Sequence, residues 1–179
     1  MSRPLSVLPK AHLHLHLTGA MRHATLVELA HHHGIRLPTA LTEDWPPQLS
    51  GIDERGWFRF QRLYDMARSV LRTEADVRRL LTEIAQDEQA EGSGWLEIQV
   101  DPDGYAARFG GITAVLELVL DAAAAASHAT GVGIGVIVAA AVLLALPIFD
   151  STANVFAGLV GGAVGGLAGL AASALRPSD

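Results

Sequence analysis

Histidine occupies every second position near the start of the chain, in the stretch Lys-Ala-His-Leu-His-Leu-His-Leu-Thr-Gly at 10–19. Alternation of apolar and polar residues with a period of two is typical of a β-strand with two unlike faces. The leucines are then expected on one face and His12, His14 and His16 on the other. Because imidazole is the commonest metal-binding side chain near neutral pH, we expect a metal-binding face. A half-exposed strand that merely has histidines on its wet side is the alternative.

The same stretch, extended to Leu-Pro-Lys-Ala-His-Leu-His-Leu-His-Leu-Thr-Gly at 8–19, resembles the opening of the adenosine deaminase family. That family begins with Pro-Lys, an HxH strand, a short polar residue and glycine. The resemblance implies that His14 and His16 bind Zn²⁺ at the end of the first strand of a (β/α)8 barrel. It also implies that His16 and Thr18 contact the substrate, a purine nucleoside of the adenosine type. His12 stands where the family often has glutamate, and Thr18 where many members have an aspartate that contacts the sugar.

A second candidate binding segment is the predicted helix at 57–71, which is rich in aromatic residues. Members of the family place an apolar helical lid over the purine after the first helix. The resemblance therefore makes Phe58, Phe60 and Tyr64 candidates for substrate binding. Ordinary packing of the helix against the core is the alternative.

The elements that would position these residues alternate between strands and helices. The order is the βαβ pattern of a parallel α/β sheet, and by the resemblance it corresponds to about the first three of the eight units of a barrel. Thr73 is a favourable N-cap for one of the helices. Glu97 and Gln99 share a strand face and are expected to be structural polar groups. Besides the first strand, we predict strands at 94–100 and 132–139, helices at 22–33, 57–71, 73–92 and 113–130, and loops at 37–56 and 105–111.

The chain lacks the late motifs of the family. In the family a third histidine, an aspartate ligand and a glutamate that transfers the proton come from later strands, and this chain has none of these motifs. A complete (β/α)8 barrel usually needs about 250 residues, whereas this chain has 179. The resemblance covers about 8–140. We therefore expect a partial barrel, no catalytic acid or base, and no deamination by the chain alone.

The distribution of charge divides the chain into two parts, 1–140 and 141–179. The segments 131–149 and 151–175 contain no charged residue. The spans 131–149 and 153–175 are each about long enough to cross a bilayer, and glycines at 158, 162 and 166 have a spacing that suits helix contact in lipid. A membrane hairpin is one interpretation. We prefer a truncated or frame-shifted ending of a barrel gene, because 132–139 already fits a strand and no Lys/Arg cluster flanks either span.

Composition excludes several functions. The net charge is -6, with 13 Lys and Arg against 19 Asp and Glu, so no basic footprint for nucleic acid is expected. Cysteine is absent, which excludes disulfides and thiolate chemistry. The first ten residues lack the apolar core of a signal peptide, so a cytoplasmic location is expected, with the membrane as the alternative.

Three hypotheses follow from the sequence. The chain is an N-terminal piece of a zinc-dependent purine nucleoside deaminase, a membrane-tethered binding module without catalysis, or a structural α/β piece completed by another chain. Open barrel edges would favour self-association.

Overall fold

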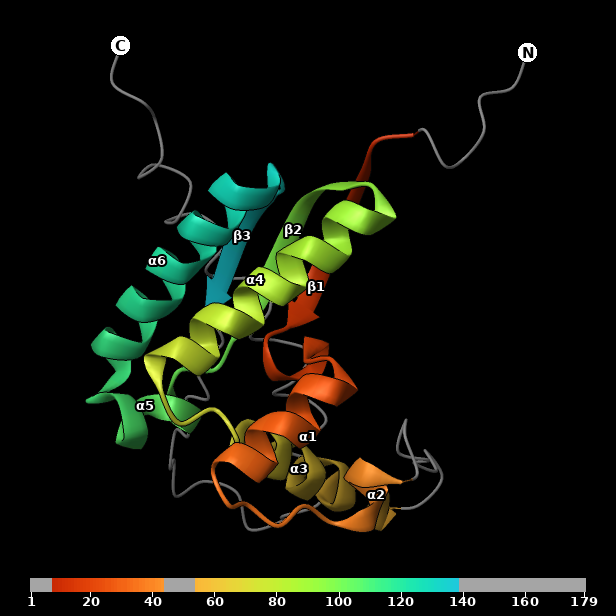
Figure 1. Cartoon of the computed structure of the whole chain (residues 1–179), viewed down its shortest axis with the longest axis vertical. Coiled ribbons are helices and arrows are strands. Elements are labelled where there is room, and N and C mark those ends of the chain that lie inside the picture. The colour runs from red at the N-terminus through yellow and green to blue at the C-terminus, as the bar shows by residue number, and fades with distance from the viewer. Residues whose placement is uncertain (1–7, 44–53, 139–179) are drawn as a thin grey trace, which may run out of the picture. The chain divides into compact units, whose positions relative to one another are not determined.

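A computed structural model describes residues 8–43 and 54–138 (Figure 1). Three parallel strands form one sheet in the order β1-β2-β3. They are β1 (Lys10–His16), β2 (Ser93–Val100) and β3 (Gly133–Val138). Helices connect each strand to the next, as parallel neighbours require. The predicted α/β architecture with a parallel sheet is therefore confirmed.

The helices lie in two groups. Helices α4 and α6 pack against each other and cover one face of the sheet, whereas α1 and α3 lie beyond the end of β1 (Figure 1). The helices are η2 (Thr18–Ala20), α1 (His23–His32), α2 (Thr39–Thr42), α3 (Glu54–Arg68), α4 (Glu74–Glu91), α5 (Asp103–Phe109) and α6 (Ile112–Thr130). The four long helices match the predicted ones to within about three residues.

Two predicted loops contain helices, so these predictions are wrong. Helix α2 lies inside the predicted loop 37–56, and α5 lies across most of 105–111. Helix α5 is stable in this position because Tyr105 is buried in the core, with 3% of its surface exposed. It ends at Gly110, whose φ of 86° is a conformation that glycine adopts without steric cost.

The core lies between the sheet and helices α4 and α6. In β2, Leu96, Ile98 and Val100 are buried under the helices, whereas Glu97 and Gln99 alternate with them and are only half-buried. The predicted stripe of α4 is confirmed, since its members are at most 2% exposed: Val77, Leu80, Leu81 and Ile84.

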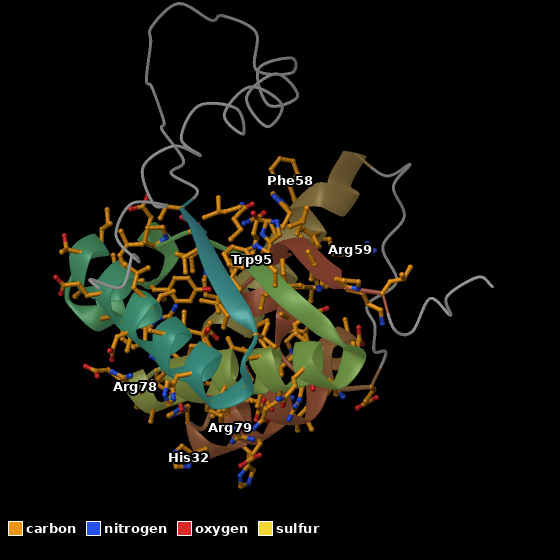
Figure 2. The ribbon with its side chains drawn as sticks, turned by 90° about the horizontal axis from the view of Figure 1, so that it is seen from above. His32, Phe58, Arg59, Arg78, Arg79 and Trp95 are labelled. Atoms are coloured by element: carbon orange, nitrogen blue, oxygen red, sulfur yellow. The ribbon has the colours of Figure 1, made fainter. Side chains whose placement is uncertain are left out.

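The opposite face of the sheet has no helix over it among the described residues. Trp95 lies on this face, 44% exposed, beside β3 (Figure 2). Its indole covers Gly133 and Gly135, where a Cβ atom would come within 2.6 and 3.0 Å of the ring. The two glycines therefore allow a large side chain to lie flat on the neighbouring strand.

Helix α6 is, within 8–43 and 54–138, the one helix long and apolar enough to cross a membrane. It packs against α4 through a buried face that includes Val115, Val119 and Ala122, as core helices do. Of the predicted hairpin, 133–138 forms β3. Gly131, at the end of α6, and Val132 precede this strand, whereas the hairpin beyond residue 138 and the predicted second part, 141–179, lie outside the described residues.

Helix α4 begins with a reciprocal cap, as predicted from Thr73. The Thr73 hydroxyl accepts a hydrogen bond from the Asp76 amide at 3.2 Å, and the Asp76 carboxylate accepts one from the Thr73 amide at 2.8 Å. Asp76 also accepts from the Arg72 amide and from Nε2 of His33, each at 2.9 Å. Burial opposes ionisation of this carboxyl, but the bonds from Arg72 and Thr73 outweigh it and lower the pKa of Asp76 below its ordinary 3.8.

We predict that Asp76→Asn lowers the free energy of unfolding at pH 7 by about 1 kcal/mol, the usual value of a cap. A carboxyl whose pKa is lowered by folding stabilises the protein above its unfolded pKa, and this stabilisation is lost as the pH falls through the folded pKa. The variant should therefore lose less stability than the parent below pH 4. Urea denaturation at several pH values measures both effects. Glu117→Gln, at an exposed position of α6, is the control, and equal acid sensitivity of parent and Asp76→Asn would contradict the assignment.

Candidate active site

Strand β1 contains an irregularity in the middle of the histidine stretch. His12 pairs with Leu96 and Leu15 pairs with Ile98, so β1 has one residue more than β2 over this segment. One extra residue on one strand is a β-bulge. His14, inside it, has φ of 65°, which is uncommon for a residue other than glycine. The predicted unbroken alternation is wrong here, because the bulge shifts the faces by one residue.

The bulge separates His12 from the other two histidines. His12 is in register with the buried Leu96, and its Nδ1 donates to Oε1 of Glu88 on α4 at 2.5 Å. His12 therefore belongs to the helix-covered face. Leu13, predicted to share a face with Leu17, is 60% exposed, whereas Leu17 is 1% exposed. The prediction of one face with three histidines is thus wrong.

His14 and His16 lie together at the carboxyl end of β1. Their ring centroids are 5.1 Å apart and the rings meet edge to face. Partial burial, and then the neighbouring His14, lower the pKa of His16. A lowered pKa favours the neutral imidazole, which is the form that binds a metal.

His14 and His16 can supply two of the ligands of a metal ion. Neutral imidazoles are typical zinc ligands, but catalytic zinc normally has three protein ligands. Within the part of the chain that the structure describes, no group of three or more His, Cys, Asp or Glu residues is placed to hold a metal. His14 and His16 would therefore need further ligands from outside these residues.

Thr18 follows the histidines and is buried, with 3% of its surface exposed. Its hydroxyl shares a 2.5 Å hydrogen bond with the hydroxyl of Tyr105 on α5. Burial raises the pKa of Tyr105 above its ordinary value, and the bond to Thr18 only partly offsets this. Burial also raises the pKa of Tyr64, again against a hydrogen bond from Thr18. Thr18 thus joins the end of β1 to two tyrosines, in α3 and α5.

Only part of the predicted aromatic set lies near the histidines. The Tyr64 ring is 6.4 Å from the His16 ring, and the Phe60 ring is 6.0 Å from Tyr64. Phe58, in the first turns of α3, is 63% exposed (Figure 2). Tyr64 and then Phe60 are therefore the members of this set that approach the site.

Arg68 and Asp101 belong to the same end of the sheet but were not among the predicted site residues. The Arg68 guanidinium lies 5.8 and 5.6 Å from the ring centres of Tyr64 and Tyr105, and it donates to Asp101 at 3.1 Å. The other carboxylate oxygen of Asp101 is buried and has no partner in the described part of the chain. The signal for Asp101 was its position directly after a strand, where barrel enzymes place their functional groups. Arg68 gave no such signal.

A parallel α/β sheet with paired histidines at the carboxyl end of its first strand has the design of a barrel hydrolase. Residues 9–157 match the family model for adenosine deaminase. The chain belongs to the adenosine deaminase family. The match extends past the predicted boundary at residue 140, which stays a prediction.

Similar proteins agree with this family. A Streptomyces virginiae protein named for adenosine/adenine deamination is 60% identical over 127 residues, which cover 71% of this chain and 38% of that protein. An adenine deaminase structure from Arthrobacter aurescens matches with a TM-score of 0.59 and 26% identity, over 74% of this chain and 39% of that one. A zinc-bound amidohydrolase from Burkholderia ambifaria matches with a TM-score of 0.58 and 25% identity, over 73% and 35%. The matched part is thus under two fifths of the length of each of these relatives.

We predict that the hydroxyls of Thr18 and Tyr105 depend on each other. Thr18→Val should lower the free energy of unfolding by about 1–3 kcal/mol, the cost of leaving a buried polar group without its partner. The double variant Thr18→Val/Tyr105→Phe removes both groups and should recover part of that loss. Urea denaturation of the four proteins measures the coupling. Thr113→Val, at an exposed position, is the control, and strictly additive losses would contradict the prediction.

Proposed function

We propose that this chain supplies the N-terminal, metal-binding part of a zinc-dependent hydrolytic deaminase of purine nucleosides. The observation that carries the proposal is the approach of the His14 and His16 rings to 5.1 Å at the carboxyl end of β1. Family membership and the zinc-bound relative support it.

His14 and His16 are the residues that would hold the metal. Zinc, when bound, lowers the pKa of water to about 7 and so makes a nucleophile available at neutral pH. The chain's own contribution is to fix the two imidazoles and to keep His16 neutral through burial. The acid that transfers the proton in such a reaction is a glutamate from later strands in the family, so it would come from beyond the described residues.

The aromatic side chains beside His16 would bind the purine. Tyr64 and Phe60 form a row that leads away from the His16 ring, and aromatic faces stack on flat heterocycles. Phe58 is the weakest member of the proposed set, because 63% of its surface is exposed.

Adenine, the free base, is a second candidate substrate. Thr18, the proposed contact of the sugar, carries no charge, and its hydroxyl is already bonded to Tyr105 inside the protein. A sugar hydroxyl would have to compete with that bond, whereas free adenine needs no such contact. The relatives include proteins named for adenine deamination, so both substrates belong in the assay.

Self-association is part of the proposal. Strands β1 and β3 form the edges of the sheet as described, and unpaired strand edges favour pairing with another chain. We propose the cytoplasm as the location.

We predict that His14→Ala and His16→Ala each abolish retention of zinc, because each removes one of two imidazole ligands. His12→Ala should have a smaller effect than removal of either proposed ligand, since His12 is not one of them. Metal content after gel filtration, measured by atomic absorption, checks this. His128→Ala, on the exposed side of α6, is the control. Equal zinc content in all variants and the parent would exclude His14 and His16 as ligands.

We also predict no measurable deamination of adenosine or adenine by the 179-residue chain, with or without added zinc. Removing one proton-transfer or electrostatic group typically costs 10²–10⁴-fold in rate, and several such groups are absent. Fusing residues 1–140 to the later strands of the Streptomyces virginiae relative should produce activity, which His16→Ala abolishes. Loss of ultraviolet absorbance of each substrate is the assay. Turnover by the chain alone that His16→Ala removes would contradict the expectation.

A further inference from the structure

A buried carboxylate on α4 is attached to β1 just before the bulge. Glu88 is only 6% exposed, and its Oε1 accepts the hydrogen bond from Nδ1 of His12 at 2.5 Å. Its Oε2 is buried and has no partner among the described residues. Burying a carboxylate is costly unless it is well bonded, so the bond to His12 has to hold for this arrangement to persist.

A second contact ties the same part of β1 to α4. Lys10 Nζ donates to the backbone oxygen of Glu91 at 2.7 Å, at the last turn of the helix. The side chains of Lys10 and His12 thus fix the first half of β1 against α4, which lies across β1 and β2 (Figure 1).

The chain is fixed again directly after the bulge. Leu15 is in register with Ile98, the Leu17 amide donates to the Gln99 carbonyl at 3.0 Å, and the Leu17 side chain is 1% exposed. Three residues of β1 therefore span what two residues of β2 span, between two fixed points.

The extra residue is accommodated at His14, whose backbone has a positive φ. A positive φ at a residue other than glycine is unfavourable and persists only where the surroundings determine it. If the upstream attachment were released, β1 could slip by one residue, and such a slip moves each side chain to the opposite face. His14 lies inside this bulge, and its ring centroid is 5.1 Å from that of His16.

We propose that Glu88 is a positioning residue for the metal site, which acts through His12 to hold the bulge that places His14 beside His16. Glu88 does not touch the metal or the substrate in this role. The inference rests on the proposed function for the identity of the metal, but the arrangement of the two histidines is a property of the metal-free chain.

The experiment uses the full chain and four variants of α4. Glu88→Ala removes the acceptor, Glu88→Met removes it but keeps the volume, and Glu88→Gln retains an oxygen that accepts from His12. Asp87→Asn changes the preceding residue, whose carboxylate bonds to Arg22 on the exposed surface, and is the control. Two quantities are measured: the nuclear Overhauser effect between the His14 and His16 rings without metal, and the affinity for Zn²⁺ by competition with a chromophoric chelator.

Glu88→Ala and Glu88→Met should lose the ring-to-ring signal and bind Zn²⁺ about 10-fold or more weakly, an effect as large as that of removing a group that orients a metal ligand directly. Glu88→Gln should restore both, and Asp87→Asn should change neither. If Glu88 were merely structural, Glu88→Gln would not restore both the ring-to-ring signal and the affinity for Zn²⁺. If the parent binds no Zn²⁺, the proposed function fails, and the ring-to-ring signal still decides the inference. A signal that persists in both Glu88→Ala and Glu88→Met overturns it.

Discussion

The extra residue in β1 is the constraint on which the site depends. A regular strand would present His12, His14 and His16 on one face. With the bulge, His12 bonds to Glu88 on α4, while the rings of His14 and His16 lie 5.1 Å apart. One histidine thereby becomes part of the attachment of the strand to its helix, and the other two become available for a ligand.

The two faces of the sheet differ in burial and composition. One is covered by α4 and α6 and holds the core, with Leu96 and Ile98 fully buried. The other carries Trp95, Glu97 and Gln99, which are exposed or half-buried. In a closed barrel this second face becomes the interior, so its mixed composition suits a core layer that needs further strands. Functional groups gather where these faces end, because the carboxyl ends of parallel strands meet at one edge.

Much of the fold was predictable from local patterns. The first strand followed from its period of two and the third from its apolar run, and α4 followed from its cap at Thr73 and its stripe of buried aliphatic residues. The prediction failed where tertiary contacts outweigh local signals. Helix α5 depends on the burial of Tyr105, and the bulge depends on the pairing of β1 with β2, neither of which a short stretch of sequence reveals. The family resemblance predicted His14 and His16 as partners, whereas the period of two placed His12 on the same face, which the register of β1 contradicts.

A cluster of Arg68, Asp101 and Tyr105 at the same edge of the sheet could not be predicted from local sequence patterns. Arg68 comes from α3, Asp101 follows β2, and Tyr105 comes from α5, yet the guanidinium lies against the tyrosine ring and bonds to the carboxylate. Gly104 makes the approach feasible, since a Cβ atom there would overlap the guanidinium of Arg68. The cluster connects the helix that carries Tyr64 to the end of β2, and Tyr64 lies against His16. The position of the aromatic helix relative to the histidines is therefore set by contacts between three segments that are distant in sequence.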